Sequence, residues 1–305
     1  MFQKIDLIIT VFNKEKYISR ALNSALSQHK YQFNKIIVVN DGSTDLSSQV
    51  LADYKKNNSK LQLINIKKSG VSIARNTGLK YSKAKYIVFL DADDELARQY
   101  LIEICRLIKF YPNCKIFSVV HQNVYAKHKI YDEDLIDNIG NLAISDNPIR
   151  EFIFKSNIIC SSGICLLKNE ILRIQFPENI IIGEDIYVWL KLFSVNKLAW
   201  STRSLVSIYK NALDRTQNSR FKEIPYFLKC KKEIVNTYKN KFWIELYFFL
   251  CFFKYYFQLN KKLNQDLLLL SNDYKFNFFL IKFLPASLLF KLYNILLLIR
   301  NKYIQ

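Results

Sequence analysis

Residues 86–94 read YIVFLDADD, a short apolar run that ends in a cluster of acidic side chains. The run is made of β-branched, aromatic and aliphatic residues, which predicts a buried strand over residues 86–90. The acidic cluster of residues 91–94 follows the last apolar residue directly. Ligands of open α/β sheets bind beyond the carboxyl ends of the strands. This stretch therefore predicts a buried strand with a binding site at its end.

The chain before this strand alternates between the patterns of buried strands and amphipathic helices. Short apolar runs predict strands at residues 5–12, 35–39 and 61–66. Helical spacing or helix-start signals predict helices at residues 15–28, 45–57, 71–82 and, after the acidic cluster, 96–111. Such alternation with short links predicts an α/β fold with a mostly parallel sheet flanked by helices.

Polar side chains follow several of the predicted strands at the point where each strand ends. Asn13 follows the first strand, Asp41 the second, and Asp91 and Asp93 the fourth. Acids in unrelated surface loops would not all follow strand ends. We therefore expect these side chains to share one site.

The pattern becomes mixed after residue 115 and changes again near residue 220. Residues 116–120 and 163–167 resemble strands, and residues 186–195 resemble a helix that Gly183-Glu184-Asp185 opens. We expect a catalytic domain over residues 1–220 and a helical C-terminal region over residues 221–305.

The C-terminal region is basic and crowded with aromatic and aliphatic residues. Residues 222–305 hold 14 Lys and Arg against 5 Asp and Glu, a difference of +9. Its richest stretches, residues 242–257 and 278–299, are broken by charges, whereas a spanning helix needs about 20 residues with few charges. A basic aromatic surface lying on an anionic membrane fits this composition, and a helical bundle packed on the main domain is the alternative.

The whole chain is strongly basic, with 45 Lys and Arg against 26 Asp and Glu and a formal charge of +19. Such an excess indicates an anionic partner: nucleic acid, an anionic membrane or a phosphorylated substrate. No recognition helix, zinc motif or RNA-binding motif supports nucleic acid. The six cysteines include no Cys-x-x-Cys pair and there is no cleavable signal layout, so we expect reduced thiols in the cytoplasm.

The acidic clusters suggest specific chemistry, each with a plain structural alternative. Asp91 and Asp93 present carboxylates suited to Mg²⁺ or Mn²⁺ on a diphosphate, although acidic turns are common. Asp41 is suited to accept hydrogen bonds from a base or ribose, or it is a turn residue before glycine. Gly70 allows close approach of a ligand, with Arg75 available for phosphate or for pairing with a nearby Asp.

Glu184 and Asp185 are candidates for the catalytic acids on the acceptor side. Asp185 would take the proton of an acceptor hydroxyl as general base, while Glu184 contacts the backbone or the acceptor. The alternative is that both acids only stabilise the start of the following helix through its dipole.

Taken together, these motifs resemble family 2 glycosyltransferases of the GT-A fold, over residues 3 to about 215. The resemblance rests on the opening strand with Thr10, Phe12 and Asn13, on the turn at residues 40–45, on residues 70–78, on Asp91-Ala92-Asp93-Asp94 and on Gly183-Glu184-Asp185. One departure is Ile208-Tyr209-Lys210-Asn211, where many relatives have a histidine near the metal; Lys210 is an alternative partner of the diphosphate there.

The resemblance implies a role for each matching residue. Asp41 contacts the nucleotide base, Asp93 reaches Mn²⁺ or Mg²⁺, Asp91 reaches the ribose or metal-bound water, and Asp185 is the catalytic base. Thr10, Phe12, Asn13, Gly70, Arg75 and Ala92 complete the donor site. The reaction implied is an inverting transfer of a hexosyl group, most often from a UDP-sugar.

We therefore expect an enzyme that extends a bacterial surface glycan, such as lipopolysaccharide, capsule or another lipid-linked saccharide. The basic aromatic tail would hold it peripherally on the cytoplasmic face of the inner membrane. The alternatives are transfer to a polyprenyl phosphate and a catalytically silent scaffold protein.

Overall fold

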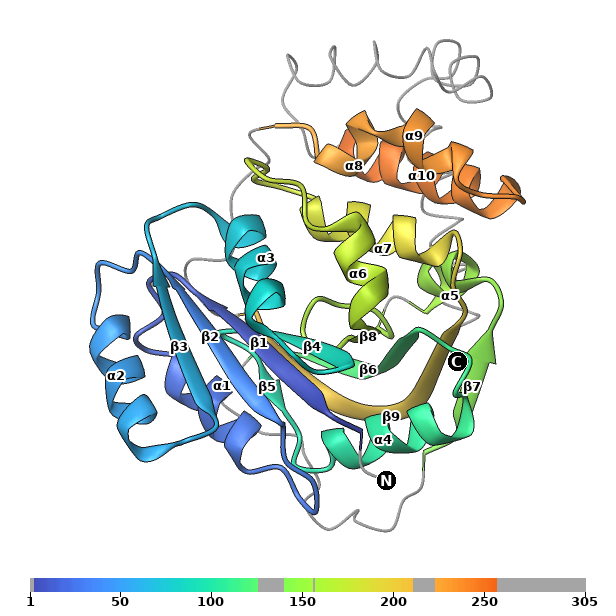
Figure 1. Cartoon of the computed structure of the whole chain (residues 1–305). Helices are drawn as coiled ribbons and strands as arrows, with labels where there is room; N and C mark the ends of the chain where they lie inside the picture. The colour runs from blue at the N-terminus through green and yellow to red at the C-terminus, as the bar shows by residue number, and fades with distance from the viewer. Residues whose placement is uncertain (1–2, 126–139, 156, 211–222, 257–305) are drawn as a thin grey trace. The chain divides into compact units, whose positions relative to one another are not determined.

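The computed structural model describes residues 3–125, 140–155, 157–210 and 223–256 (Figure 1). Its first half alternates strands and helices, as predicted from the sequence. These elements are β1 (Ile5–Val11), α1 (Ile18–Leu26), β2 (Lys35–Asp41), α2 (Ser47–Asn57), β3 (Leu61–Ile66), α3 (Val71–Tyr81) and β4 (Tyr86–Asp91).

The rest of the described chain contains elements of very different length, several of which the sequence patterns do not predict. Its strands are β5 (Glu95–Leu96), β6 (Ile116–Val124), β7 (Leu142–Ser145), β8 (Cys165–Leu167) and β9 (Leu198–Tyr209). Its helices are α4 (Tyr100–Phe110), α5 (Pro148–Phe154), α6 (Lys168–Ile174), α7 (Glu184–Phe193), α8 (Tyr226–Lys229), α9 (Lys231–Asn236) and α10 (Phe242–Tyr256).

All strands join one sheet in the order β3-β2-β1-β4-β8-β6-β9-β5, with β7 paired to β9. The strands β3, β2, β1 and β4 are mutually parallel, and β6 is parallel to β9. Strand β8 runs antiparallel to both β4 and β6, and β5 and β7 run antiparallel to β9. The predicted α/β class with a mostly parallel sheet flanked by helices is confirmed.

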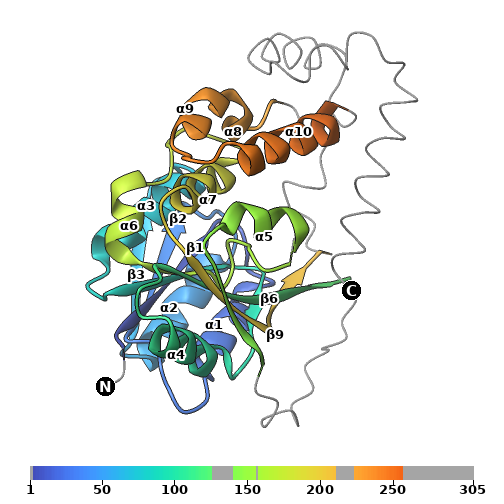
Figure 2. The same cartoon turned by 90° about the vertical axis from the view of Figure 1, so that its right-hand side faces the viewer.

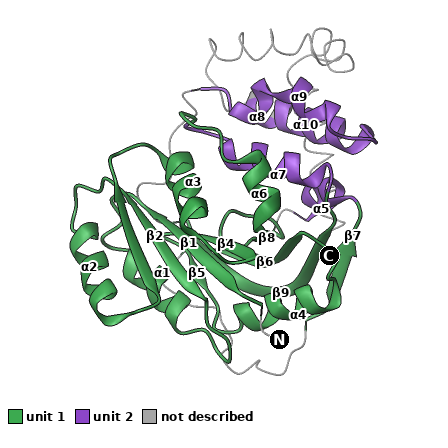
Figure 3. Ribbon diagram, viewed as in Figure 1, with its two compact units in different colours: residues 1–146, 157–180, 196–212 green, residues 147–156, 181–195, 213–305 purple. Residues whose placement is uncertain are grey.

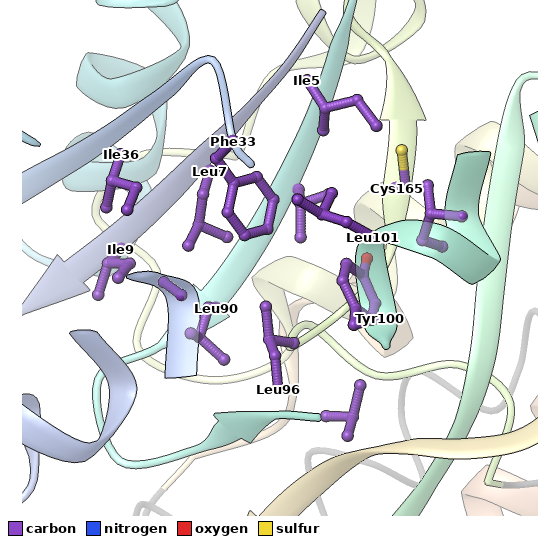
Figure 4. Close-up of a cluster of buried hydrophobic side chains, with 14 of the residues drawn as sticks. Ile5, Leu7, Ile9, Phe33, Ile36, Leu90, Leu96, Tyr100, Leu101 and Cys165 are labelled. Carbon is purple, nitrogen blue, oxygen red and sulfur yellow. The ribbon is translucent and has the colours of Figure 1, made fainter. Parts of the chain in front are cut away.

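The main core lies on one face of this sheet. Alternate residues of β1, such as Ile5, Leu7 and Ile9, are fully buried there beside the helices α1 and α4 (Figure 4). Figures 1 and 2 show α1 and α4 on this side and α3 on the other. Because both faces are covered, the central strands are apolar on both sides, which explains their unbroken hydrophobic runs.

Helix α3 packs very closely on the opposite face of the sheet. A Cβ atom added at Gly78 would overlap Cγ2 of Ile8, the β1 residue on that face. Asn76 of the same helix exchanges two hydrogen bonds with the backbone of Phe176, at 2.8 and 2.9 Å. These contacts hold α3 in one position against the sheet, and α3 in turn positions Arg75.

The chain divides into two compact units (Figure 3). Unit 1 comprises residues 1–146, 157–180 and 196–212 and holds the sheet; unit 2 comprises residues 147–156, 181–195 and 213–305. In unit 2, α10 buries Ile244, Phe248 and Phe252 completely. Phe248 lies beside Phe227 of α8, with ring centroids 6.2 Å apart. Of the two apolar stretches named above, residues 242–256 form α10, whereas residues 278–299 lie outside the described ranges.

One predicted boundary is wrong, because the helix expected over residues 96–111 begins only at Tyr100. Leu96 instead pairs with Val206 as part of β5, and the N–H of Ala97 donates to the carbonyl of Leu205. Pairing with β9 therefore overrides the local helical pattern. Within the described ranges, no helix is long and apolar enough to cross a membrane.

Candidate functional site

The candidate donor site lies at the carboxyl ends of β1, β2 and β4, which are neighbouring parallel strands. Thr10 of β1 stands beside Asp91 at the end of β4 and beside Val39 of β2. Asp41 is the last residue of β2. The sheet therefore brings the predicted residues of the first, second and fourth strands to one edge, as expected for an α/β binding site.

Asp41 is buried and accepts three hydrogen bonds from the segment that precedes α3. The backbone N–H groups of Ser69 and Gly70 donate to its carboxylate at 2.6 and 2.9 Å, and the Lys68 ammonium lies 3.0 Å away. The same ammonium lies 3.1 Å from the ring centroid of Phe12, which is partly exposed. Asp41, Lys68 and Phe12 thus form one cluster that pairs an acceptor and a donor beside an aromatic face.

Asn13 connects the end of β1 to the loop that follows β2. Its side-chain oxygen accepts the N–H of Thr44 at 2.8 Å, and its own N–H donates to Oγ of Ser43 at 3.1 Å. Asn13 also has a positive φ of 51°, which asparagine tolerates better than most residues. Its role in the described structure is to fix the two loops against each other.

The Asp91-Ala92-Asp93 motif forms a tight turn after β4, closed by a 3.0 Å hydrogen bond from the N–H of Asp94 to the carbonyl of Asp91. Asp91 pairs with Arg75 at 3.2 Å, and Asp93 pairs with the ammonium of Lys14 at 3.1 Å. Ala92 is buried between them. Both predicted carboxylates therefore lie in one turn, and each has a basic partner.

Asp94, the next residue, is held differently. Its carboxylate accepts the Ser162 hydroxyl at 2.6 Å and the N–H of Tyr209 at 3.3 Å. Tyr209 also donates its hydroxyl to Glu95 at 2.6 Å. Burial and this contact with Glu95 raise the pKa of Tyr209 to about 12, so the phenol stays protonated and donates. These contacts join the acidic turn to the end of β9.

Gly70 and Arg75 belong to the start of α3. Gly70 has a φ of 95°, and a Cβ added there would meet nothing within 4 Å, so its backbone faces open space. The Arg75 guanidinium lies 5.1 Å from the ring centroid of Phe176 while it pairs with Asp91. Arg75 therefore makes the ion pair with a nearby Asp that the sequence analysis gave as the alternative to phosphate binding. This pair also places the Arg75 guanidinium beside the turn of Asp91-Ala92-Asp93.

Glu184 and Asp185 begin α7, which belongs to unit 2. Gly183 caps the helix with a φ of 83°, and a Cβ there would lie 2.9 Å from the Phe227 ring. Glu184 is buried, whereas Asp185 is partly exposed and accepts the N–H of Ile186 at 2.7 Å. Both acids stand in the first turn of α7, where negative charge interacts favourably with the helix dipole.

The residues of the acidic turn fit a divalent cation that is shared with a ligand. Carboxylate oxygens are what Mg²⁺ and Mn²⁺ prefer, and such ions commonly keep substrate phosphates and water as further ligands. Within the described ranges, the acidic turn included, no group of three or more His, Cys, Asp or Glu side chains could hold a metal. Asp91 and Asp93 would therefore supply only part of the coordination shell.

The sequence analysis missed three basic residues of this edge: Lys14, Arg20 and Lys68. Arg20 donates to the backbone carbonyl of Asp93 at 2.5 Å and stacks on Tyr209, 3.4 Å from the ring centroid. Lysine and arginine are frequent along the whole chain, so their type alone carries no signal. The position of Lys14 directly after Asn13, at a strand end, was the available indication.

The structure also describes residues 208–210, which occupy the region where many members of the resembled family have a histidine. Lys210 follows β9, and its N–H donates to the carbonyl of Val124 at 2.9 Å. The nearest histidine in the sheet is His121 of β6, whose pKa burial lowers to about 4, with a smaller contribution from the charge of Lys210. His121 is therefore neutral near pH 7.

Residues 6–173 match the family model described as "Glycosyl transferase family 2". The chain is 27% identical over 229 residues to "Glycosyltransferase GlyA" of Streptococcus pneumoniae, which covers 72% of this chain and 32% of the relative. It is 36% identical over 185 residues to "Teichoic acid poly(glycerol phosphate) polymerase" of Staphylococcus epidermidis. This match covers 58% of this chain and 24% of the relative. The chain thus spans about a third or less of the length of these relatives.

The fold is similar to the crystal structure of S. aureus TarS 1-349 in complex with UDP-GlcNAc. The TM-score is 0.70, and the superposition covers 89% of this chain and 80% of that chain. The sequence identity is 18%, so this likeness concerns the fold.

Proposed function

Because this chain belongs to glycosyl transferase family 2 and is a glycosyltransferase, we propose that it transfers a sugar from a UDP-sugar to a hydroxyl of a cell-surface glycan. The observation that carries the proposal is the position of Asp41 at the end of β2 and of Asp91 and Asp93 at the end of β4, two parallel strands that lie on either side of β1. This edge offers polar groups for a nucleotide and acids for the cation of a diphosphate.

The donor part of the proposal rests on the chemistry of this edge. Asp41 and Lys68 offer an acceptor and a donor for a base, and the exposed face of Phe12 suits stacking. Arg75 suits the diphosphate, which guanidinium groups bind well. UDP-GlcNAc is the ligand of the S. aureus TarS structure that shares the fold, which favours a UDP-sugar over other nucleotides.

In the proposed reaction, the acceptor oxygen attacks the anomeric carbon while the bond from that carbon to the diphosphate oxygen breaks. Asp185 takes the proton of the acceptor hydroxyl, and Glu184 orients the acceptor or the backbone. Arg75 pairs with the diphosphate as its negative charge increases. When bound at Asp91 and Asp93, Mg²⁺ or Mn²⁺ would neutralise the leaving diphosphate. A single displacement of this kind inverts the anomeric configuration.

The acceptor is proposed to be a cell-surface glycan because one relative is named as a teichoic acid polymerase. Lipopolysaccharide and capsule, the examples expected from the sequence, remain members of the same class. The excess of +9 in residues 222–305, from 14 Lys and Arg against 5 Asp and Glu, supports peripheral attachment at an anionic membrane on its cytoplasmic face.

Replacement of the proposed base tests this function. UDP release is measured with a panel of UDP-sugars and hydroxyl-bearing glycan acceptors, for the natural chain and for Asp185→Asn. The turnover rate of the variant should fall by about 10²- to 10⁴-fold, because general base catalysis contributes that much. Binding of UDP should stay unchanged. Glu178→Gln, which neutralises an exposed acid outside the site, is the matched control.

Two results would replace the proposal. UDP release that requires a polyprenyl phosphate and survives Asp185→Asn would support the alternative transferase, because that acceptor is already an anion. The absence of UDP release with every acceptor, from folded protein, would support a catalytically silent scaffold.

A further inference from the structure

The carboxylates of Asp91 and Asp93 each already have a cation supplied by the protein. The Lys14 ammonium lies 3.1 Å from Oδ2 of Asp93, and both side chains are largely buried, at 15% and 7% exposed. The Arg75 guanidinium lies 3.2 Å from Oδ1 of Asp91, with 6% and 37% exposed. A divalent ion that arrives alone would therefore meet two carboxylates whose charge is already balanced.

These basic residues differ in how firmly their side chains are held. Arg20 is fixed between the backbone carbonyl of Asp93 and the Tyr209 ring, and Arg75 is nearly buried beside Phe176. Lys14 ends in a compact ammonium on a flexible stem of four carbons, which can turn to a new partner at little cost.

The backbone of Lys14, in contrast, is fixed. Its N–H donates to Oγ of Ser47 at 2.8 Å, and its carbonyl accepts the N–H groups of Tyr17 and Ile18, both at 2.9 Å, where α1 begins. Any change of partner at this position is therefore confined to the side chain, which leaves the loop and the helix in place.

We propose that Lys14 is an exchangeable counter-ion of Asp93. In the absence of a sugar donor, the ammonium of Lys14 pairs with the Asp93 carboxylate. When a nucleoside diphosphate binds together with a divalent cation, the cation takes the place of Lys14 at Asp93, and Lys14 pairs with the diphosphate. This inference rests on the proposed function, because it concerns the same donor site. The transfer reaction itself requires neither Lys14 nor a change of its partner from Asp93 to the diphosphate.

The physical consequence is a strong coupling between the metal and the nucleotide. The turn supplies two carboxylates, and Lys14 and Arg75 compete for them, so the metal alone gains little. A diphosphate supplies both further oxygen ligands and negative charge for the displaced ammonium. Coupling between two ligands is typically about 5- to 150-fold in affinity and acts equally in both directions.

Binding of Mn²⁺, followed through the electron paramagnetic resonance signal of the free ion, tests the inference. The natural chain should bind Mn²⁺ weakly alone and at least about 5-fold more tightly with UDP. Lys14→Gln should bind Mn²⁺ alone about 5- to 150-fold more tightly than the natural chain, because the ammonium of Lys14 no longer competes with the ion for Asp93. Its affinity for UDP at saturating Mn²⁺ should fall. Lys16→Gln removes the same charge from an exposed position two residues away and should leave both affinities unchanged.

Two further variants isolate the Lys14–Asp93 pair. Lys14→Arg retains a positive charge and should keep the weak binding of Mn²⁺ alone. Adding Asp93→Asn to Lys14→Gln should abolish the gain in Mn²⁺ affinity, because the gain requires the carboxylate of Asp93.

The failure of this inference differs from the failure of the proposed function. If UDP binds with Mn²⁺ but the natural chain binds Mn²⁺ as tightly without UDP, Lys14 does not act as a counter-ion; this result needs no variant to fold. Equal Mn²⁺ affinities of the natural chain and Lys14→Gln would overturn the inference in the same way. If neither UDP nor any UDP-sugar binds the folded natural chain, the donor assignment itself is wrong.

Discussion

Asp93 and Asp94 are neighbours in sequence, yet their surroundings differ. Asp93 pairs with a flexible lysine, whereas Asp94 is bound by a serine hydroxyl and a backbone N–H within the fold. The hydroxyl of Ser162 also accepts the N–H of Asp91 at 3.1 Å, so Asp94 and Ser162 together shape the turn. At the scale of single residues, we therefore propose that Asp93 binds the ligand and that Asp94 supports the turn.

Asparagine substitutions separate these two roles. Asp94→Asn should lower the free energy of unfolding by about 1–3 kcal/mol, because its amide presents N–H groups where the carboxylate accepts two hydrogen bonds. Asp93→Asn should instead abolish Mn²⁺-dependent nucleotide binding. Urea unfolding and nucleotide titration measure the two effects. The assignment is wrong if Asp94→Asn unfolds like the natural chain while losing nucleotide binding.

At the scale of elements, the contact between α3 and β1 positions Arg75 above the edge of the sheet. Ala in place of Gly within a helix usually stabilises a protein by about 0.5–1 kcal/mol. Gly78→Ala should nevertheless destabilise this chain by about 1–3 kcal/mol, because the added methyl group overlaps the Ile8 side chain. Urea unfolding measures the change in free energy.

A second substitution controls for this explanation. Ile8→Ala removes the atoms that the new methyl group would overlap, so Gly78→Ala added to Ile8→Ala should cost much less than Gly78→Ala alone. Strictly additive costs would show that the close contact is not the cause.

The success of sequence analysis also differs between elements. The four parallel strands were predicted because each is a short, largely apolar run, and β1, β2 and β4 are buried along nearly their whole length. The acids at the ends of β2 and β4 were predicted with them. Strand β9 was missed because polar residues at 201–204 interrupt its apolar pattern, while pairing with β6 and β7 keeps it extended. Lys14 was missed for a related reason: its importance comes from Asp93, which is distant in sequence and close only in the fold.

At the scale of the whole molecule, the charge of +19 predicts attraction to anionic surfaces. The full chain should co-sediment with vesicles that contain phosphatidylglycerol and should be released as the salt concentration rises toward about 0.5 M. Salt screens the attraction between the basic protein and the anionic lipid, because the Debye length is roughly 10 Å at 0.1 M and becomes shorter as the ionic strength rises. Vesicles of phosphatidylcholine alone are the control. A chain that ignores anionic vesicles at low salt would contradict the proposed membrane attachment.

The measurement that tests the central claim most directly is donor binding by thermal shift, with UDP-, GDP-, CMP- and dTDP-sugars, each with and without Mn²⁺. A ligand that binds only the folded state raises the melting temperature. We expect a Mn²⁺-dependent rise with UDP-sugars that Asp93→Ala abolishes. No rise with any nucleotide sugar, from protein that is folded by circular dichroism, would contradict the account.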